Sequence, residues 1–97
     1  MPKAILWTKK ADESFDDIIE YLSIKWSEKE ISQFTLQTME TLRVISQHPS
    51  AFIQDKKTKF RKARINRLIS LIYLEKEEHI ELLFFWNNRM NPKRIVT

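Results

Sequence analysis

The sequence predicts an α+β fold: an N-terminal strand, an antiparallel helical hairpin and a small, mostly antiparallel β-sheet, in the order β-α-α-β-β-β. Three observations lead to this prediction. Apolar residues recur at helical spacing through residues 11–47, with one break at Ser27. Pro49 then ends the helical pattern. Two apolar stretches of strand length follow, LISLIYLE from Leu68 and HIELLFFW from His79.

The N-terminal part contains a short β-like run and the first helix. Lys3–Trp7 has strand character, and its distance in sequence from the other strands predicts a place at the edge of the sheet. Thr8 is suited to cap the helix that follows, with acidic residues near its positive N-terminal end. The apolar stripe of this helix comprises Ala11, Phe15, Ile18, Ile19, Leu22 and Trp26.

The second helix is expected to run from Ser27 to about Gln47. Ser27 and Glu30 have the spacing of a capping box. The core side of this helix should contain Ile31, Phe34, Leu42 and Ile45, with Thr35 and Thr38 in the seam. Because almost no linker separates the helices, they should form an antiparallel hairpin on one face of the sheet.

The C-terminal half predicts a loop at residues 49–59 and three strands at about 60–65, 68–75 and 79–86. Asn66 and Lys76-Glu77-Glu78 are suited to the two turns. In the last strand, alternation places Ile80, Leu82, Phe84 and Trp86 on one face, and Leu83 and Phe85 on the other. A strand that is apolar on both faces should be central in the sheet.

Composition restricts the function classes. The 97 residues should form a single domain, 1–97, and the absence of cysteine excludes disulfides and thiolate metal sites. The absence of glycine excludes glycine-rich phosphate loops, so no nucleotide cofactor is expected. The apolar runs are too short for a signal peptide or a membrane span, and we expect a soluble cytoplasmic protein.

Charge is sorted along the chain. Residues 1–48 have six basic and eight acidic side chains, a net charge of −2, whereas residues 49–97 have eleven and five, a net charge of +6. The segment Lys56–Arg67 alone has seven basic residues and no acid. One interpretation is a charged strand edge that opposes aggregation. The other is a cationic site for RNA, DNA or an acidic protein, formed by Lys57, Lys59, Arg61, Lys62, Arg64, Arg67 and Arg89.

Other chemistry has little support in the sequence. His48 and His79 are isolated from further ligands, so no metal site is expected. No nucleophile motif is present. The acids of the first helix are expected to form a solvated face, and the tryptophans to pack in the core. In an extended segment 60–65, Arg61, Ala63 and Ile65 should face one side, and Lys62 and Arg64 the other.

The ordered set of these features resembles the RelE/ParE superfamily, the toxins of type II toxin–antitoxin pairs, over nearly the whole length. The similar features are the pattern A-x3-F-x2-I-I-x-x-L followed by Trp26, the helix that ends in His48-Pro49, the basic segment, and the apolar hairpin before Arg89, Asn91 and Pro92. The long helical hairpin looks more ParE-like than RelE-like.

The resemblance implies two target classes. ParE-like members bind and poison DNA gyrase, and RelE-like members cleave messenger RNA in the ribosome without a metal. A RelE-like site would use Arg61, Arg64, Arg67 and Arg89 as catalytic residues. Cleavage also needs a general base, for which arginine is unsuited, and Tyr73 is the one nearby candidate. The C-terminal tyrosine of active RelE-like nucleases has no counterpart after Arg89.

The first hypothesis is therefore a ParE-like, non-enzymatic inhibitor of gyrase and replication, of the kind that stabilises plasmids. A cognate antitoxin with an acidic, amphipathic segment would neutralise it, and the complex could contain a toxin dimer. The second hypothesis is a RelE-like endoribonuclease. The third is a basic nucleic-acid-binding module whose affinity falls steeply with salt.

Overall fold

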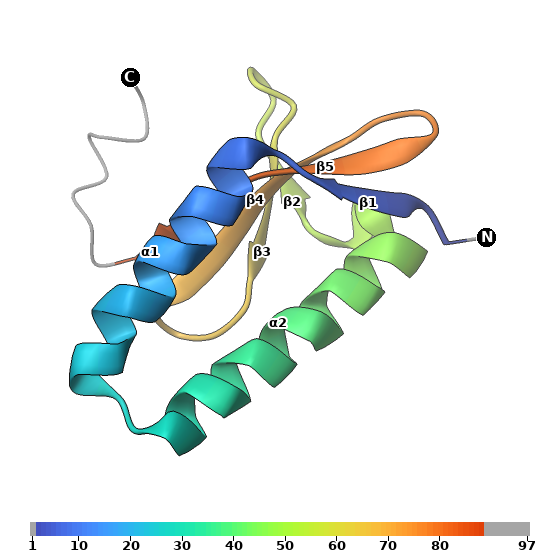
Figure 1. Cartoon of the computed structure of the whole chain (residues 1–97). Coiled ribbons are helices and arrows are strands. Elements are labelled where there is room, and N and C mark those ends of the chain that lie inside the picture. Colours follow the sequence, from blue (N-terminus) through green and yellow to red (C-terminus); the bar gives the residue numbers. More distant parts are fainter. Residues whose placement is uncertain (1, 89–97) are drawn as a thin grey trace.

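The computed structural model describes residues 2–88 and confirms the predicted α+β class (Figure 1). Two helices lie on one side of a five-stranded sheet, and the first strand precedes them in the chain. The elements are β1 (Ala4–Trp7), α1 (Lys9–Lys25), α2 (Glu28–Gln47), a 3₁₀ turn (Pro49–Ala51), β2 (Ile53–Gln54), β3 (Arg61–Arg64), β4 (Ile69–Glu75) and β5 (His79–Asn87).

The strand order is β1-β5-β4-β3-β2. The strand β1 lies at one edge, as predicted, and pairs in parallel with β5, while all other neighbours are antiparallel. The expectation of a plain loop at residues 49–59 was wrong, because this segment contains the 3₁₀ turn and the strand β2 at the opposite edge. Two residues are too few to show an alternating pattern, so β2 left no periodic signal in the sequence.

Both helices begin at the predicted caps. The Thr8 side chain accepts a hydrogen bond from the Ala11 N–H, and Ser27 and Glu30 form the expected capping box. In α2 Thr38 is buried as predicted, but Thr35 is exposed, and its hydroxyl donates to the Ile31 carbonyl. Neither helix within residues 2–88 has both the length and the apolar character that a membrane-spanning helix needs.

A β-bulge in β5 corrects the predicted faces of this strand. Tyr73 of β4 pairs with Leu82, but the preceding residue Ile72 pairs with Phe84, so Leu83 is the extra residue. The bulge places Phe84 on the face opposite Leu82, where strict alternation predicted one shared face. Phe85, instead, joins Leu82 in the core.

The core lies between the helices and one face of the sheet. Phe15 of α1 is partly buried and packs against this core, with ring centroids 5.8 Å from Phe34 and 5.1 Å from Phe85. The Phe15 ring also contacts Trp7 at 5.7 Å. This aromatic cluster joins α1, α2 and the sheet, and thus holds the helical hairpin against the strands.

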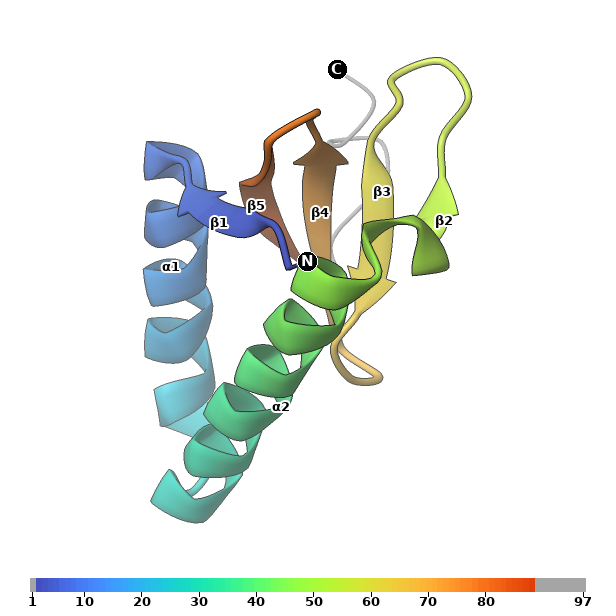
Figure 2. The same ribbon diagram turned by 90° about the vertical axis from the view of Figure 1, so that its right-hand side faces the viewer.

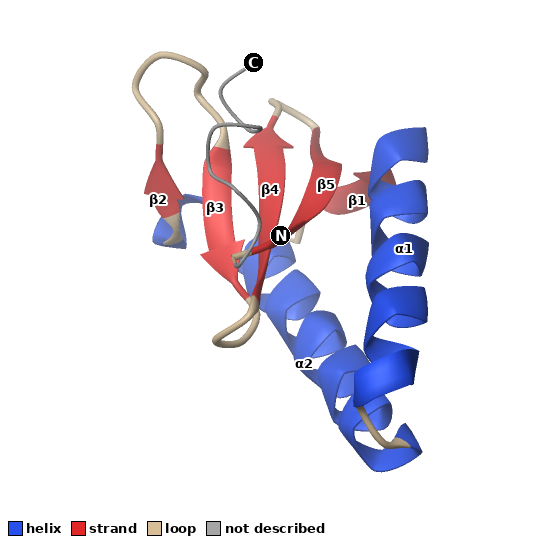
Figure 3. Ribbon diagram, turned by 90° about the vertical axis from the view of Figure 1, so that its left-hand side faces the viewer, coloured by secondary structure: helices blue, strands red, loops and turns tan. Residues whose placement is uncertain are grey.

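The helix α1 also covers the part of β5 that extends beyond β1. The Thr8 hydroxyl donates to the Leu82 carbonyl at 2.7 Å, and the Ser14 hydroxyl accepts from the Phe85 N–H at 2.8 Å. Figure 3 shows α1 alongside this end of β5, with the other sheet face turned toward the viewer. The edge of β5 therefore has side-chain partners where β1 ends.

Candidate partner-binding surface

The basic segment Lys56–Arg67 is divided between the two ends of β3 (Figure 2). Lys56, Lys57 and Lys59, here called the tip lysines, lie in the loop between β2 and β3. Arg64 and Arg67, the turn arginines, lie at the opposite end, where β3 leads into β4. The four-residue strand separates the two groups by about 13 Å, at roughly 3.3 Å per residue. The cations therefore form two groups rather than one patch.

The loop that carries the tip lysines is ordered by Asp55. Its Oδ2 accepts hydrogen bonds from the N–H of Thr58 at 2.8 Å, the hydroxyl of Thr58 at 3.0 Å and the N–H of Lys57 at 3.0 Å. These bonds, the Thr58 N–H foremost, lower the pKa of Asp55. Among the described residues, no acidic side chain forms an ion pair with a tip lysine. The three ammonium groups are thus exposed on a defined loop.

The side chains of β3 point to the two faces as predicted. Ala63 is fully buried in the core, so Arg61 shares the face that the helices and the 3₁₀ turn cover. Lys62 and Arg64 are exposed on the opposite face. Among the cations of this strand, Arg61 is therefore the one in an internal position.

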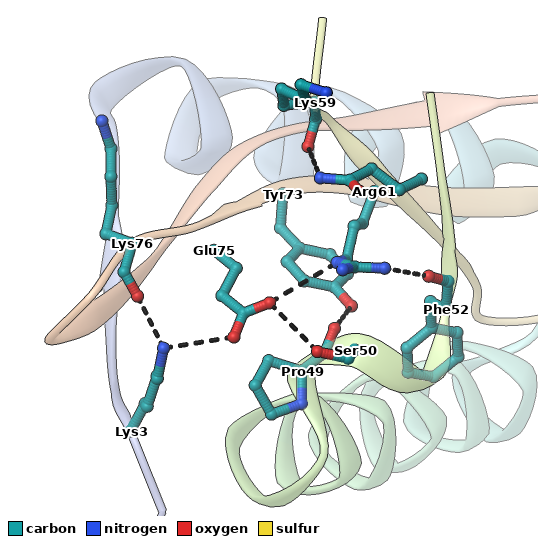
Figure 4. Close-up of polar contacts among 10 residues, drawn as sticks. Lys3, Pro49, Ser50, Phe52, Lys59, Arg61, Tyr73, Glu75 and Lys76 are labelled. Atoms are coloured by element: carbon teal, nitrogen blue, oxygen red, sulfur yellow. Dashed lines mark hydrogen bonds and ion pairs between the residues drawn. The ribbon is translucent and has the colours of Figure 1, made fainter. Parts of the chain in front are cut away.

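Arg61 is held inside a network of polar contacts (Figure 4). Its Nη1 donates to the Phe52 carbonyl at 2.7 Å, and its Nε lies 3.6 Å from Oε1 of Glu75. Glu75 also accepts from Lys3 at 3.2 Å and from the Ser50 hydroxyl at 3.3 Å. The Arg61 side chain is only 15% exposed. It connects the 3₁₀ turn and β2 to the sheet through this hydrogen bond and ion pair, although its buried Nε has no hydrogen-bond partner within residues 2–88.

Tyr73, the candidate base, lies beside Arg61 on β4. Its residue exposure is 0%, and its hydroxyl donates to the Pro49 carbonyl at 2.6 Å. Burial raises the pKa of Tyr73 to about 12. At neutral pH the phenol is protonated and directed at a backbone carbonyl, so it is poorly placed to accept a proton from a substrate.

The sheet face opposite the helices brings cations next to aromatic residues. The strand register places Lys62 in one row with Ile72 and Phe84, and Arg64 in the next row with Ser70 and Trp86. In these rows Trp86 and Ile72 are each 9% exposed and Ser70 is 0% exposed, whereas Phe84 is partly exposed and has the Lys10 ammonium 5.0 Å from its ring centroid. Exposed cations beside an accessible aromatic ring are typical of surfaces that bind single-stranded nucleic acid, and here Phe84 is the accessible ring.

The turn arginines differ in how they are bound. Arg64 donates from Nε to the Asn66 carbonyl at 3.3 Å and from Nη2 to the Arg67 carbonyl at 3.1 Å, so it supports the turn itself. Arg67 is exposed and lines a hollow of about 260 Å³ between α2 and the β3–β4 turn. Its guanidinium has no hydrogen-bond or ion-pair partner within residues 2–88.

Two further predictions concern residues elsewhere. Arg89, predicted as a binding or catalytic residue, lies outside the described residues, as do Asn91 and Pro92. His79 is on β5, with Nε2 3.2 Å from Oε2 of Glu81, at the end of the sheet away from the turn arginines. In the described part of the chain no three residues of the kinds that bind metals come together.

Sequence reasoning missed Glu75 and the lining of the hollow. Glu75 joins Lys3 and Ser50, which are 72 and 25 positions away in the sequence. The hollow brings together Trp26, Glu30, Gln33, Gln37, Asn66, Arg67 and Leu68. No local pattern could have found either group, because the fold alone makes these residues neighbours.

Comparison with known protein families gives one match that spans most of the chain. The family described as "ParE toxin of type II toxin-antitoxin system, parDE" matches residues 5–92. No match was found among the curated proteins.

Solved structures share the fold at low sequence identity. The chain superposes on a protein of the chromosomal ParDE TA system from P. aeruginosa with a TM-score of 0.72 and 16% identity, covering 88% of this chain and 95% of that one. The YoeB dimer from Staphylococcus aureus gives a TM-score of 0.58 at 19% identity, with coverages of 87% and 94%. The protein HP0894 from Helicobacter pylori gives 0.57 at 20%, with coverages of 91% and 96%.

Proposed function

The chain belongs to the family of ParE toxins of type II toxin–antitoxin systems, and we propose that it inhibits bacterial DNA gyrase by binding rather than by cutting. Inhibition of gyrase in the cytoplasm stops replication and growth. Such a toxin stabilises a plasmid when the antitoxin is lost faster than the toxin. This chain is thus proposed to act as the growth-inhibiting member of its pair.

One observation carries the preference for binding over cutting. Arg61 and Tyr73, the cation and the base that a nuclease mechanism would draw on, are both engaged in internal contacts, with Glu75 and with the Pro49 carbonyl. The remaining described arginines can stabilise a phosphate, but arginine is unsuited as a general base. This arrangement supports a toxin whose surface recognises a macromolecule.

The proposed partner in the resting cell is a cognate antitoxin with an acidic, amphipathic segment. The tip lysines and the turn arginines present unpaired positive charge at both ends of β3. An acidic segment that contacts both groups would screen them together. A second toxin copy in the same complex is part of this proposal, since a structure described as a YoeB dimer shares the fold.

The sheet face opposite the helices favours one alternative, a RelE-like endoribonuclease. Lys62 and Arg64 are exposed on it, and the partly exposed Phe84 lies in the row of Lys62, an arrangement that suits an RNA phosphate beside a stacked base. Catalysis would then depend on Arg64, Arg67 and Arg89, with a general base other than Tyr73.

Inducible expression of the chain, with and without its neighbouring antitoxin, tests the toxin proposal. We expect growth arrest that the antitoxin reverses, together with trapped gyrase–DNA complexes and DNA-damage signalling. Transcripts cut at codon positions soon after induction would instead establish the nuclease. Unimpaired growth at verified expression levels would contradict both.

The double variant R64A/R67A separates the two mechanisms further. The control variant is R43A, which removes a cation from the outer face of α2. If the gyrase proposal is correct, the wild-type chain cuts no transcripts, so neither variant changes transcript cutting. If cutting occurs and the double variant abolishes it while R43A does not, the alternative is correct.

A further inference from the structure

The β3–β4 turn presents Arg67 on a backbone that is held from several sides. The side-chain oxygen of Asn66 accepts from the N–H groups of Leu68 at 2.8 Å and Ile69 at 2.9 Å. The Arg67 carbonyl accepts from Arg64 at 3.1 Å and from the Asn88 side chain at 3.3 Å. These bonds therefore fix the backbone of Arg67 without using any hydrogen-bond donor of the Arg67 guanidinium.

The same turn is joined to α2. The Asn66 amide donates to Oε1 of Gln37 at 3.3 Å, which leaves the Gln37 Nε2 hydrogens without a partner among the described residues. Gln33, one helical turn earlier, lines the same hollow. Two residues of α2 with amide side chains thus line the hollow together with Arg67.

The hollow contains one cationic and one acidic side chain, those of Arg67 and Glu30. Glu30 lines it, but Oε1 of Glu30 accepts from both the N–H and the hydroxyl of Ser27, each at 3.3 Å, in the capping box. The Glu30 carboxylate keeps its negative charge, but within residues 2–88 it forms no ion pair with Arg67. Trp26 and Leu68 complete the lining and offer an apolar wall to a ligand's carbon chain.

We infer that this hollow binds a single carboxylate group of a partner polypeptide, with Arg67 as its ion-pair partner and the amides of Gln33 and Gln37 as further donors. A carboxylate matches the planar fork of one guanidinium. Phosphate is the poorer fit, since a dianion would face one cation and the nearby Glu30 carboxylate. The biological meaning rests on the proposed toxin function, but the site itself is a property of the isolated chain.

Titration of the full-length chain with small probes, followed by nuclear magnetic resonance, tests the inference directly. The reporters are the Arg67 Nε–H and the Trp26 indole N–H. The probes are N-acetylglutamic acid α-amide for an acidic side chain, N-acetylglycine for a C-terminal carboxylate, N-acetylglutamine amide as the uncharged isostere, and inorganic phosphate. We expect saturable shifts, in the millimolar range, with at least one of the two carboxylates and none with the isostere. Which carboxylate binds more tightly identifies its source.

The variants R67A and R67Q should weaken carboxylate binding at least tenfold, whereas R43A should retain it. Two charge-removing variants of different size keep the test valid if one of them folds poorly. The inference is overturned if the wild-type chain shows no saturable shift, if the isostere binds equally, if phosphate binds more tightly, or if both Arg67 variants bind like the wild type. Growth inhibition is measured separately, so a chain that binds the carboxylate without arresting growth would contradict the toxin proposal alone.

Discussion

At the scale of single residues, Arg61 and Tyr73 show how position decides the chemistry of a side chain. They pair across β3 and β4, on the face that the 3₁₀ turn covers. Arg61 contacts Glu75 and the Phe52 carbonyl, and Tyr73 donates to the Pro49 carbonyl. Both residue types are common at catalytic sites, yet here both hold the segment between α2 and β3 in place.

The raised pKa of Tyr73 predicts a loss of stability at alkaline pH. Its pKa is about 12 in the folded chain against 10.0 for an unperturbed tyrosine. Folding therefore favours the neutral phenol: the stabilisation is complete below pH 10 and is lost as the pH rises from 10 through 12. We expect the free energy of unfolding to fall by as much as about 2.5 kcal/mol across this interval.

Denaturant unfolding at a series of pH values measures this effect. The variant Y73F, which cannot ionise, should start about 1 kcal/mol less stable because the Pro49 carbonyl loses its partner. Between pH 10 and 12, the free energy of unfolding of Y73F should then decrease less than that of the wild-type chain. Identical pH dependence in both proteins would mean that Tyr73 does not titrate as inferred.

At the scale of elements, the β2–β3 hairpin shows how a chain without glycine makes a tight turn. Lys59 has φ 68°, which is the positive-φ conformation that glycine adopts without strain. The turn is closed by the Asp55 N–H donating to the Phe60 carbonyl at 2.8 Å and by the bonds to the Asp55 side chain. The hydrogen bonds of Asp55 thus compensate for the backbone strain at Lys59, whose ammonium group lies at the loop tip.

Replacing Lys59 by glycine should therefore stabilise the chain. We expect K59G to raise the free energy of unfolding by about 0.5 to 1 kcal/mol, because it removes the left-handed strain of a residue with a Cβ atom. Chemical denaturation gives the value. The matched control K57G removes the same charge at a residue without positive φ, and should lower stability by a similar amount. Stabilisation by both variants would point to charge repulsion instead.

At the scale of the whole molecule, the aromatic cluster around Phe15 joins both helices to the sheet. Phe34 of α2 is 1% exposed and contacts the rings of Phe15 and Trp26. On the outer side of the same helix, Leu36 is 69% exposed. Two apolar residues two positions apart thus differ greatly in what they contribute to the fold.

Truncation of Phe34 should therefore destabilise the fold strongly. We expect F34A to lower the free energy of unfolding by about 3 to 5 kcal/mol, and L36A to change it by less than about 0.5 kcal/mol. Thermal or urea unfolding compares the two variants. A small effect of F34A would show that α2 is held by other contacts.

The sequence by itself determined the elements whose signals are local. The caps at Thr8 and Ser27, the turn at Asn66 and the strands β4 and β5 depend on residues a few positions apart, so periodicity and turn chemistry predicted them. The alternation of Arg61 against Lys62 and Arg64 also followed from the two-residue repeat of a strand.

Only the tertiary structure decided how these pieces act together. The bulge at Leu83 reverses the faces of the following residues, because pairing with β4, rather than the pattern of β5 itself, sets the register. Likewise, Arg61 becomes internal because Glu75 and the 3₁₀ turn meet it from distant parts of the chain, while Arg67 remains unpaired beside α2. Long-range packing therefore selected, from one basic run, the cations that support the fold and those that are available to a partner.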